Sequence, residues 1–169
     1  MTDTPQSTPT FGGLILEQDQ EWQYYFWYPK GWYRYELGDG RTGVLCSPQD
    51  EHPSTYFSVE TQHLPAAVLA EDIETLRQGI QEGLSRLPNL RIESADDTVS
   101  GKRIILERVF TFVDRDAIRK RRIRLLYAGS TLYSLISQGS SEQDYEHWLS
   151  MLNYCHMTFE TGTFDTTNL

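Results

Sequence analysis

The sequence contains few cysteines and no long apolar run. Its two cysteines among 169 residues, Cys46 and Cys155, form neither a paired zinc motif nor a CxxC redox motif, so both are predicted to be buried free thiols. No stretch approaches the roughly eighteen apolar residues of a membrane-spanning helix, which predicts no membrane insertion. Residues 1–10 are polar and lack the basic and apolar segments of a secretory signal. A cytoplasmic protein is therefore predicted, unless a leader precedes this sequence.

Positive charge is also scarce. The chain carries 15 Lys and Arg residues against 24 Asp and Glu residues, which gives a formal net charge of -9 and an isoelectric point near 4.8. Proteins that bind nucleic acids or anionic membranes normally present a basic field to them. The composition therefore predicts an acidic, soluble protein without a nucleic-acid partner.

The local motifs of common catalytic and phosphate-binding sites are missing as well. The sequence has no Gly-x-Ser-x-Gly nucleophile motif, no GxGxxG dinucleotide motif and no Walker loop. Its carboxylate pairs, Asp96 with Asp97 and Asp114 with Asp116, fall in segments that are predicted to be turns, where aspartate is favoured for local hydrogen bonding. The sequence therefore predicts neither an enzyme nor a bound cofactor.

The four histidines form no HxH or HExxH motif. His147 and His156 are nine residues apart in a predicted helix, which places them on opposite sides of its axis. His52, His63 and Glu51 are the one combination that the spacing leaves open for a metal site. The alternative is that these histidines are solvated residues of loops. No metal is predicted.

One domain is predicted over residues 13–160, between a disordered N-terminal tail (1–12) and a flexible C-terminal tail (161–169). Aromatic and β-branched runs predict strands at residues 13–16, 22–28, 32–37, 43–46 and 56–61. Further runs at residues 103–113, 118–128 and 131–138 are separated by short polar or glycine-containing turns, and they predict a three-stranded antiparallel meander.

Two helices are predicted. Apolar residues recur at threes and fours over residues 67–87, which indicates a long amphipathic middle helix that ends before a proline. Gly79 and Gly83 weaken a helix interior, so they predict close packing against a neighbour. A second helix is predicted to begin after Ser140 or Ser141, either of which can cap it.

Aromatic residues are concentrated in one short stretch. Eight of the twelve residues from Tyr24 to Tyr35 are aromatic, and a Pro-Lys-Gly turn interrupts them. Strand alternation sends Tyr24, Phe26 and Tyr28 to one face and the intervening rings to the other. The rings are predicted to lie in the core of a sheet with helices on both faces, while a partly exposed ring cluster would mark an interaction surface.

The sequence Tyr28-Pro29-Lys30-Gly31-Trp32, the meander and a terminal helix that carries Trp148 together resemble the PsbP-like superfamily. This superfamily includes the PsbP subunit of photosystem II, Mog-type release factors for the GTPase Ran and bacterial DcrB-like proteins. The resemblance spans about residues 24–160, and Tyr28, Pro29, Trp32 and Trp148 are its fold-signature residues. It implies an α+β fold in which an antiparallel β-sheet is flanked by helices as an α/β/α sandwich. Its members act mainly by binding, which implies a non-catalytic accessory or chaperone-like module.

One strand runs against the acidic composition. Residues 119–124 hold five of the fifteen basic residues, and alternation would place Arg119 and Arg121 on one face and Lys120, Arg122 and Arg124 on the other. These cations either pair with acids on neighbouring strands, such as Glu107, Asp114 and Asp116, or bind an acidic partner or phosphate.

The prediction for function follows from these observations. The chain is predicted to bind a protein partner, and the predicted partner-binding residues are Arg119, Arg121, Arg122 and Arg124. The alternative is a small-ligand carrier or enzyme of cystatin-like α+β fold, with a pocket between helix and sheet. The sequence leaves the partner and the oligomeric state open.

Overall fold

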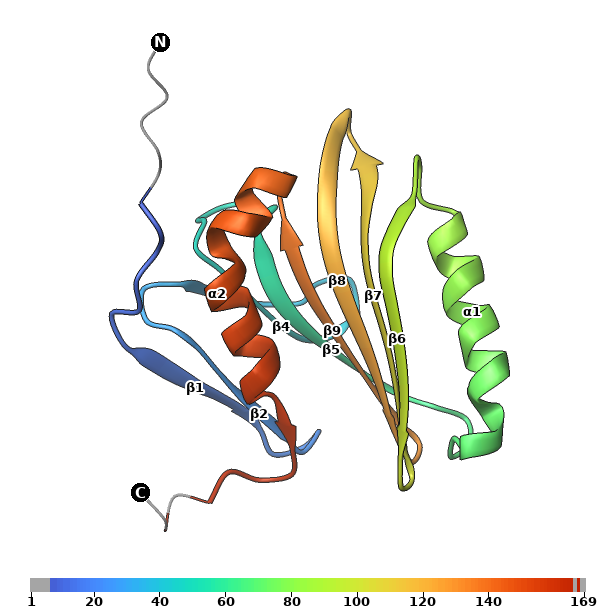
Figure 1. The fold of residues 1–169 in the computed structure, drawn as a ribbon. Coiled ribbons are helices and arrows are strands. Elements are labelled where there is room, and N and C mark those ends of the chain that lie inside the picture. The colour runs from blue at the N-terminus through green and yellow to red at the C-terminus, as the bar shows by residue number, and fades with distance from the viewer. Residues whose placement is uncertain (1–6, 166, 168–169) are drawn as a thin grey trace.

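The computed structural model describes residues 7–165 and 167, which form an α+β domain with two antiparallel sheets and two α-helices (Figure 1). The small sheet has the strand order β1-β2-β10 and consists of β1 (Leu14–Asp19), β2 (Tyr24–Pro29) and β10 (Glu160–Thr161). The large sheet has the order β3-β4-β5-β9-β8-β7-β6. The sequence predicted one sheet, and this is corrected: the aromatic strand β2 belongs to a second, smaller one.

The strands of the large sheet are β3 (Tyr33–Glu36), β4 (Thr42–Ser47), β5 (Tyr56–His63), β6 (Arg91–Ser100), β7 (Arg103–Asp114), β8 (Ala117–Ala128) and β9 (Thr131–Gly139). The meander therefore has four strands, because β6 precedes the three that were predicted. Asp96 and Asp97 lie within β6 and not in a turn, which is a further correction. All residues of this edge strand except Asp97 are exposed, and β6 has no apolar alternation that sequence reading could detect.

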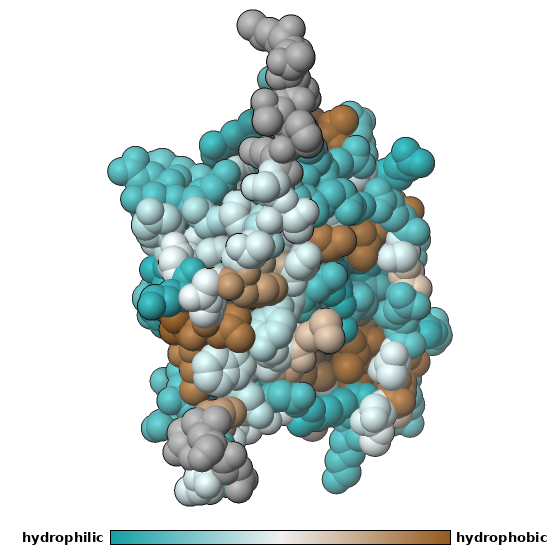
Figure 2. All heavy atoms as spheres, turned by 60° about the vertical axis from the view of Figure 1, so that its left-hand side comes forward, coloured by the Kyte–Doolittle hydropathy of each residue, from teal (hydrophilic) through white to brown (hydrophobic). Residues whose placement is uncertain are grey.

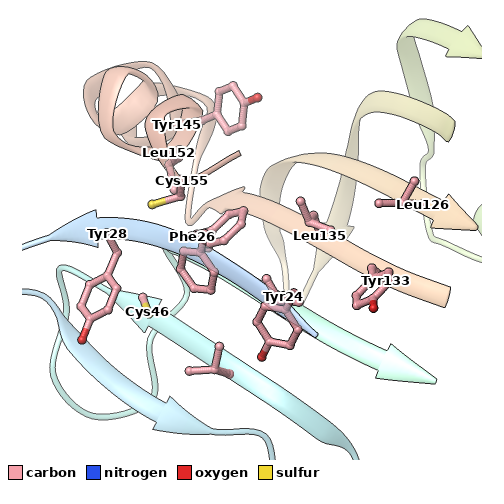
Figure 3. Packing of buried hydrophobic residues seen from close by; sticks show 13 residues of the cluster. Tyr24, Phe26, Tyr28, Cys46, Leu126, Tyr133, Leu135, Tyr145, Leu152 and Cys155 are labelled. Atoms are coloured by element: carbon pink, nitrogen blue, oxygen red, sulfur yellow. The ribbon is translucent and has the colours of Figure 1, made fainter. Parts of the chain in front are cut away.

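The helix α2 (Glu142–Thr158) packs on one face of the large sheet. Ser141 caps its N-terminus, because its Oγ accepts a hydrogen bond from the backbone N–H of Asp144 at 3.0 Å. Tyr145, Leu152 and Cys155 point from α2 into the main core, where Figure 3 shows them above the rings of β2 and the apolar residues of β4 and β9. Both cysteines are buried free thiols, as predicted.

The aromatic strand β2 turns one face to the large sheet. Tyr24, Phe26 and Tyr28 are buried there, and the rings of Phe26 and Phe57 meet edge to face with centroids 5.0 Å apart. The opposite face is covered by the C-terminal segment and not by a helix, because the ring of Phe164 contacts those of Tyr25 and Trp27 at 5.2 Å and 5.7 Å. The core role of the strand is confirmed, and the expected covering of both faces by helices is wrong.

The helix α1 (Ile73–Ser85) lies on the other face of the large sheet, after a short 3₁₀ turn (Ala70–Asp72). Successive residues of β8 point to opposite faces of the large sheet. Leu126 packs in the core beneath α2, and Tyr127 packs in the core beneath α1. The helix starts later than predicted, since residues 64–68 are held by backbone hydrogen bonds to the turn between β8 and β9. A Cβ atom on Gly79 or Gly83 would meet nothing within 4 Å, so the predicted close packing there is wrong.

The packed chain extends past both predicted domain boundaries. Phe11 packs on Tyr154 of α2, and β10 pairs with β2 beyond residue 160. The rest of the predicted tails, residues 1–6, 166 and 168–169, lies outside the described residues. Within residues 7–165 and 167, no helix is long and apolar enough to cross a bilayer.

Candidate functional site

The basic strand β8 divides its charges between the two faces of the large sheet, as alternation predicts. On the α2 side, Arg122 and Arg124 both reach Glu107 of β7, with Nε to carboxylate distances of 3.1 Å and 2.7 Å. Arg122 also donates to Oδ1 of Asn153 on α2 at 3.1 Å. Burial alone would raise the pKa of Glu107, but the two guanidinium groups hold it below its usual value. Arg122 therefore links α2 to the sheet, and Arg124 pairs with Glu107 within the sheet.

The remaining cations of β8 are also bound internally. Lys120 approaches Glu93 at 3.0 Å and lies over the ring of Tyr145. On the α1 side, Arg119 donates to the backbone carbonyl of Ser140 at 2.7 Å. Arg121 donates to Gln138 at 2.9 Å, and its guanidinium lies 4.7 Å from the centroid of the Phe112 ring.

Every one of these five side chains is partly buried and has a partner, which matches the cross-strand pairing considered for this strand. A role in partner binding for Arg119, Arg121, Arg122 and Arg124 stays a prediction.

Three of the four fold-signature residues meet in a different place, at the turn after β2. The backbone N–H of Trp32 donates to the carbonyl of Pro29 at 3.2 Å and closes the turn. Gly31 has a φ of 93°, which is the left-handed conformation that a type II turn requires at its third position. The turn directs Trp32 toward α2, where its ring meets that of Trp148 at a centroid distance of 5.9 Å and an angle of 82°.

These residues line a surface groove of about 340 Å³, which we call the tryptophan groove. Its lining residues are Pro9, Thr10, Pro29, Lys30, Gly31, Trp32, Pro48, Trp148 and Met151. Both tryptophans are partly exposed, and their rings stand nearly perpendicular to each other. Tyr28, the fourth signature residue, is buried in the core and does not line the groove. The sequence singled out Trp32 and Trp148 but treated them only as marks of a fold.

The N-terminal segment lies along the tryptophan groove. Pro9 and Thr10 line it, and Phe11 packs on Tyr154 with ring centroids 5.3 Å apart. The carbonyl of Gly13 accepts a hydrogen bond from the backbone N–H of Lys30 at 2.9 Å. Figure 2 shows this side of the molecule, where pale residues of intermediate hydropathy continue below the N-terminus between apolar patches.

A second hollow, of about 460 Å³, lies where the segment before α1 meets the tips of two hairpins. It is lined by Ala67, Val68, Leu69, Ala70, Gly101, Lys102 and Gly129. An adjoining hollow of about 310 Å³ shares Ala67 and Val68 and reaches Tyr127. The predicted pocket between helix and sheet thus has a counterpart at the start of α1, and its lining is mostly apolar.

The candidate catalytic and metal-binding side chains do not assemble. In the part of the chain that the structure describes, no three His, Cys, Asp or Glu side chains are grouped to hold a metal ion. The ring of His63 instead stacks on Trp22 at 4.1 Å. Burial raises the pKa of the Cys46 thiol to about 12 and that of Cys155 well above its usual value, which keeps both thiols protonated.

His156 is the unusual buried group. Its side chain is 1% exposed, the ring contacts Phe57, and neither ring nitrogen has a hydrogen-bond partner among the described residues. Burial, with the nearby charges of Arg122 and Arg124, lowers the pKa of His156 well below the ordinary 6.5. The folded protein therefore holds this imidazole neutral.

We expect His156 to destabilise the fold in mild acid. Because its pKa is depressed in the folded state, the unfolded chain binds a proton that the folded chain does not, and stability is lost as the pH falls below about 6.5. The slope in the free energy of unfolding should approach about 1.4 kcal/mol per pH unit about one unit below this value, and urea denaturation between roughly pH 5 and 7 measures it. His156→Leu should remove this slope, whereas His147→Leu, on the partly exposed side of α2, should keep it. If the free energy of unfolding changed with pH in the same way for wild type and His156→Leu, the prediction would be contradicted.

Comparisons with known proteins address the fold. No protein-family model matches the sequence, and no curated protein sequence matches it. The solution structure of cyanobacterial PsbP (CyanoP) from Synechocystis sp. PCC 6803 superposes with a TM-score of 0.62 at 14% identity, over 94% of this chain and 99% of that one.

Two bacterial structures are also similar. LpqN of Mycobacterium tuberculosis, which is involved in cell envelope biogenesis, has a TM-score of 0.57 at 9% identity, over 90% of this chain and 86% of that one. PA94 of Pseudomonas aeruginosa, a protein of unknown function and putative regulator, has a TM-score of 0.54 at 11% identity, over 90% and 100%. The chain thus has a PsbP-like fold, as its resemblance predicted. Structural similarity at sequence identities this low establishes the fold but not a function.

Proposed function

We propose that this protein is a non-catalytic binding module that recognises another protein through the tryptophan groove. The observation that carries the proposal is the perpendicular pair of Trp32 and Trp148 in a groove of about 340 Å³ on the surface. Tryptophan is enriched among the residues that dominate binding energy at protein interfaces, because it buries a large area and offers one polar N–H group. Both rings are already set in place, one by the turn at Gly31 and the other by α2.

The proposed partner-binding surface is the tryptophan groove and not the basic strand β8. There, Arg122 and Arg124 already bind Glu107, and a partner would have to displace internal pairs before it gained any of its own. At the groove, the rings are held by packing and are partly exposed. A partner can therefore use both rings as they stand, without breaking an ion pair, which favours affinity.

We expect Trp148→Ala to weaken binding of the partner by about 30-fold or more, which corresponds to about 2 kcal/mol for an aromatic hot spot. The partner would be isolated from the source organism on the immobilised wild-type chain, and its affinity for wild type and variant then measured by titration calorimetry. Trp22→Ala is the matched control, because Trp22 is also partly exposed but stacks on His63 away from the groove.

Two outcomes would contradict the proposal. One is equal affinity for the wild type and a folded Trp148→Ala variant. The other is a loss of affinity in Arg121→Glu with no loss in Trp148→Ala. Arg121 lies on the α1 side of β8, so this result would show that the partner binds the basic strand.

Carriage of a small apolar ligand is a second candidate, favoured by the hollow of about 460 Å³ at the start of α1. Its volume falls in the range of small-molecule sites, and Lys102 is the ionisable residue in its lining. This lining suits binding of an apolar molecule better than acid–base chemistry, which requires convergent titratable groups.

A further inference from the structure

We propose that the tryptophan groove takes an extended, proline-containing segment, and that residues 7–13 of this chain are its built-in competitor. This inference rests on the proposed function, since it names the kind of partner segment that the same groove accepts. Its two parts stand on the chemistry of the groove and on the placement of the N-terminal segment.

The chemistry of the groove matches an extended proline-containing chain. Pro29 and Pro48 contribute rigid apolar walls, and Trp32 and Trp148 contribute two rings set at an angle of 82° to each other. Aromatic-lined grooves recognise proline-rich segments, because a segment of this kind is already extended and loses little conformational freedom on binding. Lys30 is the charged residue in the lining, so the groove suits an uncharged or mildly acidic segment.

The chain already places a segment of this kind against the groove. Residues 7–13, Ser-Thr-Pro-Thr-Phe-Gly-Gly, carry no charge and belong to no helix or strand. Pro9 and Thr10 lie at the groove, next to the residues of the turn and of α2 that line it. A proline of the chain itself thus lies beside the two tryptophans, where we expect a partner's proline to bind.

Few contacts hold this segment in place. The backbone hydrogen bond from Lys30 to Gly13 and the ring contact of Phe11 with Tyr154 are its described attachments, and Phe11 is still 43% exposed. Residues 7–13 are attached to the domain at Gly13, so their effective concentration at the groove is on the order of millimolar. A partner segment must therefore compete with them, and loosening them should raise its affinity.

The test uses the full chain and a synthetic peptide of residues 7–13, acetylated and amidated at its ends. In the Pro9→Ala/Phe11→Ala variant, the chain's own segment loses the ring contact of Phe11 with Tyr154 and the proline that lines the groove, so the peptide should bind about 10-fold more tightly than to wild type. Binding is followed by NMR through the indole N–H signals of the four tryptophans. The signals of Trp32 and Trp148 should shift, while those of Trp22 and Trp27 should stay in place and report an intact fold.

A peptide with Pro9→Ala is the matched control and should bind at least several-fold more weakly. The inference is overturned if the peptide binds wild type and variant equally, if proline is dispensable in the peptide, or if Trp22 and Trp27 shift as much as the groove pair. Should the double variant lose its fold, Phe11→Ser alone replaces it with the same expected direction. A partner whose capture depends on Trp148, together with no peptide binding, would refute this inference and leave the proposed function standing.

Discussion

Gly139→Ala should lower the free energy of unfolding by about 3 kcal/mol, near the upper end of the usual cost of overpacking. A Cβ atom at this position would lie 2.4 Å from the backbone nitrogen of Tyr145 and 2.6 Å from its Cα, far inside van der Waals contact. The obstacle is the backbone of α2, so no rotation of a side chain can relieve it. The strand cannot retreat easily either, because Gly139 ends β9 opposite Lys120 of β8.

This prediction is checked by thermal and urea unfolding. The midpoint of thermal unfolding should fall by roughly 6–12 °C in a chain of this length. Gly79→Ala is the control, since its Cβ meets nothing within 4 Å and the change to alanine should stabilise α1 by up to about 1 kcal/mol. An unchanged midpoint for Gly139→Ala would mean that α2 does not sit this close to β9. Because Trp148 lies on α2, the variant should also disturb the tryptophan groove.

Asp97→Ala should destabilise the protein by about 3–5 kcal/mol, the usual cost of breaking a buried ion pair by removing one partner. Oδ1 of Asp97 accepts a hydrogen bond from Arg108 at 2.5 Å, and Oδ2 accepts one from Arg77 of α1 at 2.6 Å. Arg108 is only 8% exposed, so the variant would leave a buried guanidinium without its carboxylate. Burial acts to raise the pKa of Asp97, but the two arginines hold it below its usual value.

The neighbouring residue offers a matched control. Asp96 is exposed on the other face of β6, so Asp96→Ala should change the free energy of unfolding by no more than about 0.5 kcal/mol. Urea unfolding near neutral pH compares the two variants. Similar small losses for both would show that the Arg108 pair is not a structural anchor. Replacing both partners, as Asp97→Leu/Arg108→Met, should recover part of the loss, because no charge is then left buried.

The sequence identified the two tryptophans of the tryptophan groove but not their role. Trp32 follows a recognisable turn and Trp148 lies at helical spacing, so each could be placed on its own element from the sequence. Their meeting depends on the packing of α2 beside the small sheet, across 116 positions of sequence in the numbering of the chain. No local pattern encodes a contact of that range, and the fold resemblance supplied only the elements.

The basic strand shows the opposite case. Its charges are conspicuous in the sequence, and their alternation was predicted correctly, yet each finds an internal partner in the folded chain. Glu107 precedes Arg122 by 15 residues and becomes its neighbour only through the antiparallel pairing of β7 with β8. A run of charge therefore indicates a binding surface only when the register of the adjacent strands leaves it unpaired.

The sequence by itself determined the elements that rest on local chemistry: the aromatic strand and its glycine turn, the capped terminal helix, the hairpins of the meander and the α+β class. The tertiary structure alone decided the existence of the edge strand β6, the division into two sheets, the pairing of the basic strand and the joining of two tryptophans in one groove. The physical reason is the separation in sequence between the residues that interact. Turn conformation, capping and alternation depend on residues a few positions apart, whereas burial, ion pairing and grooves depend on which distant segments the packed core brings together.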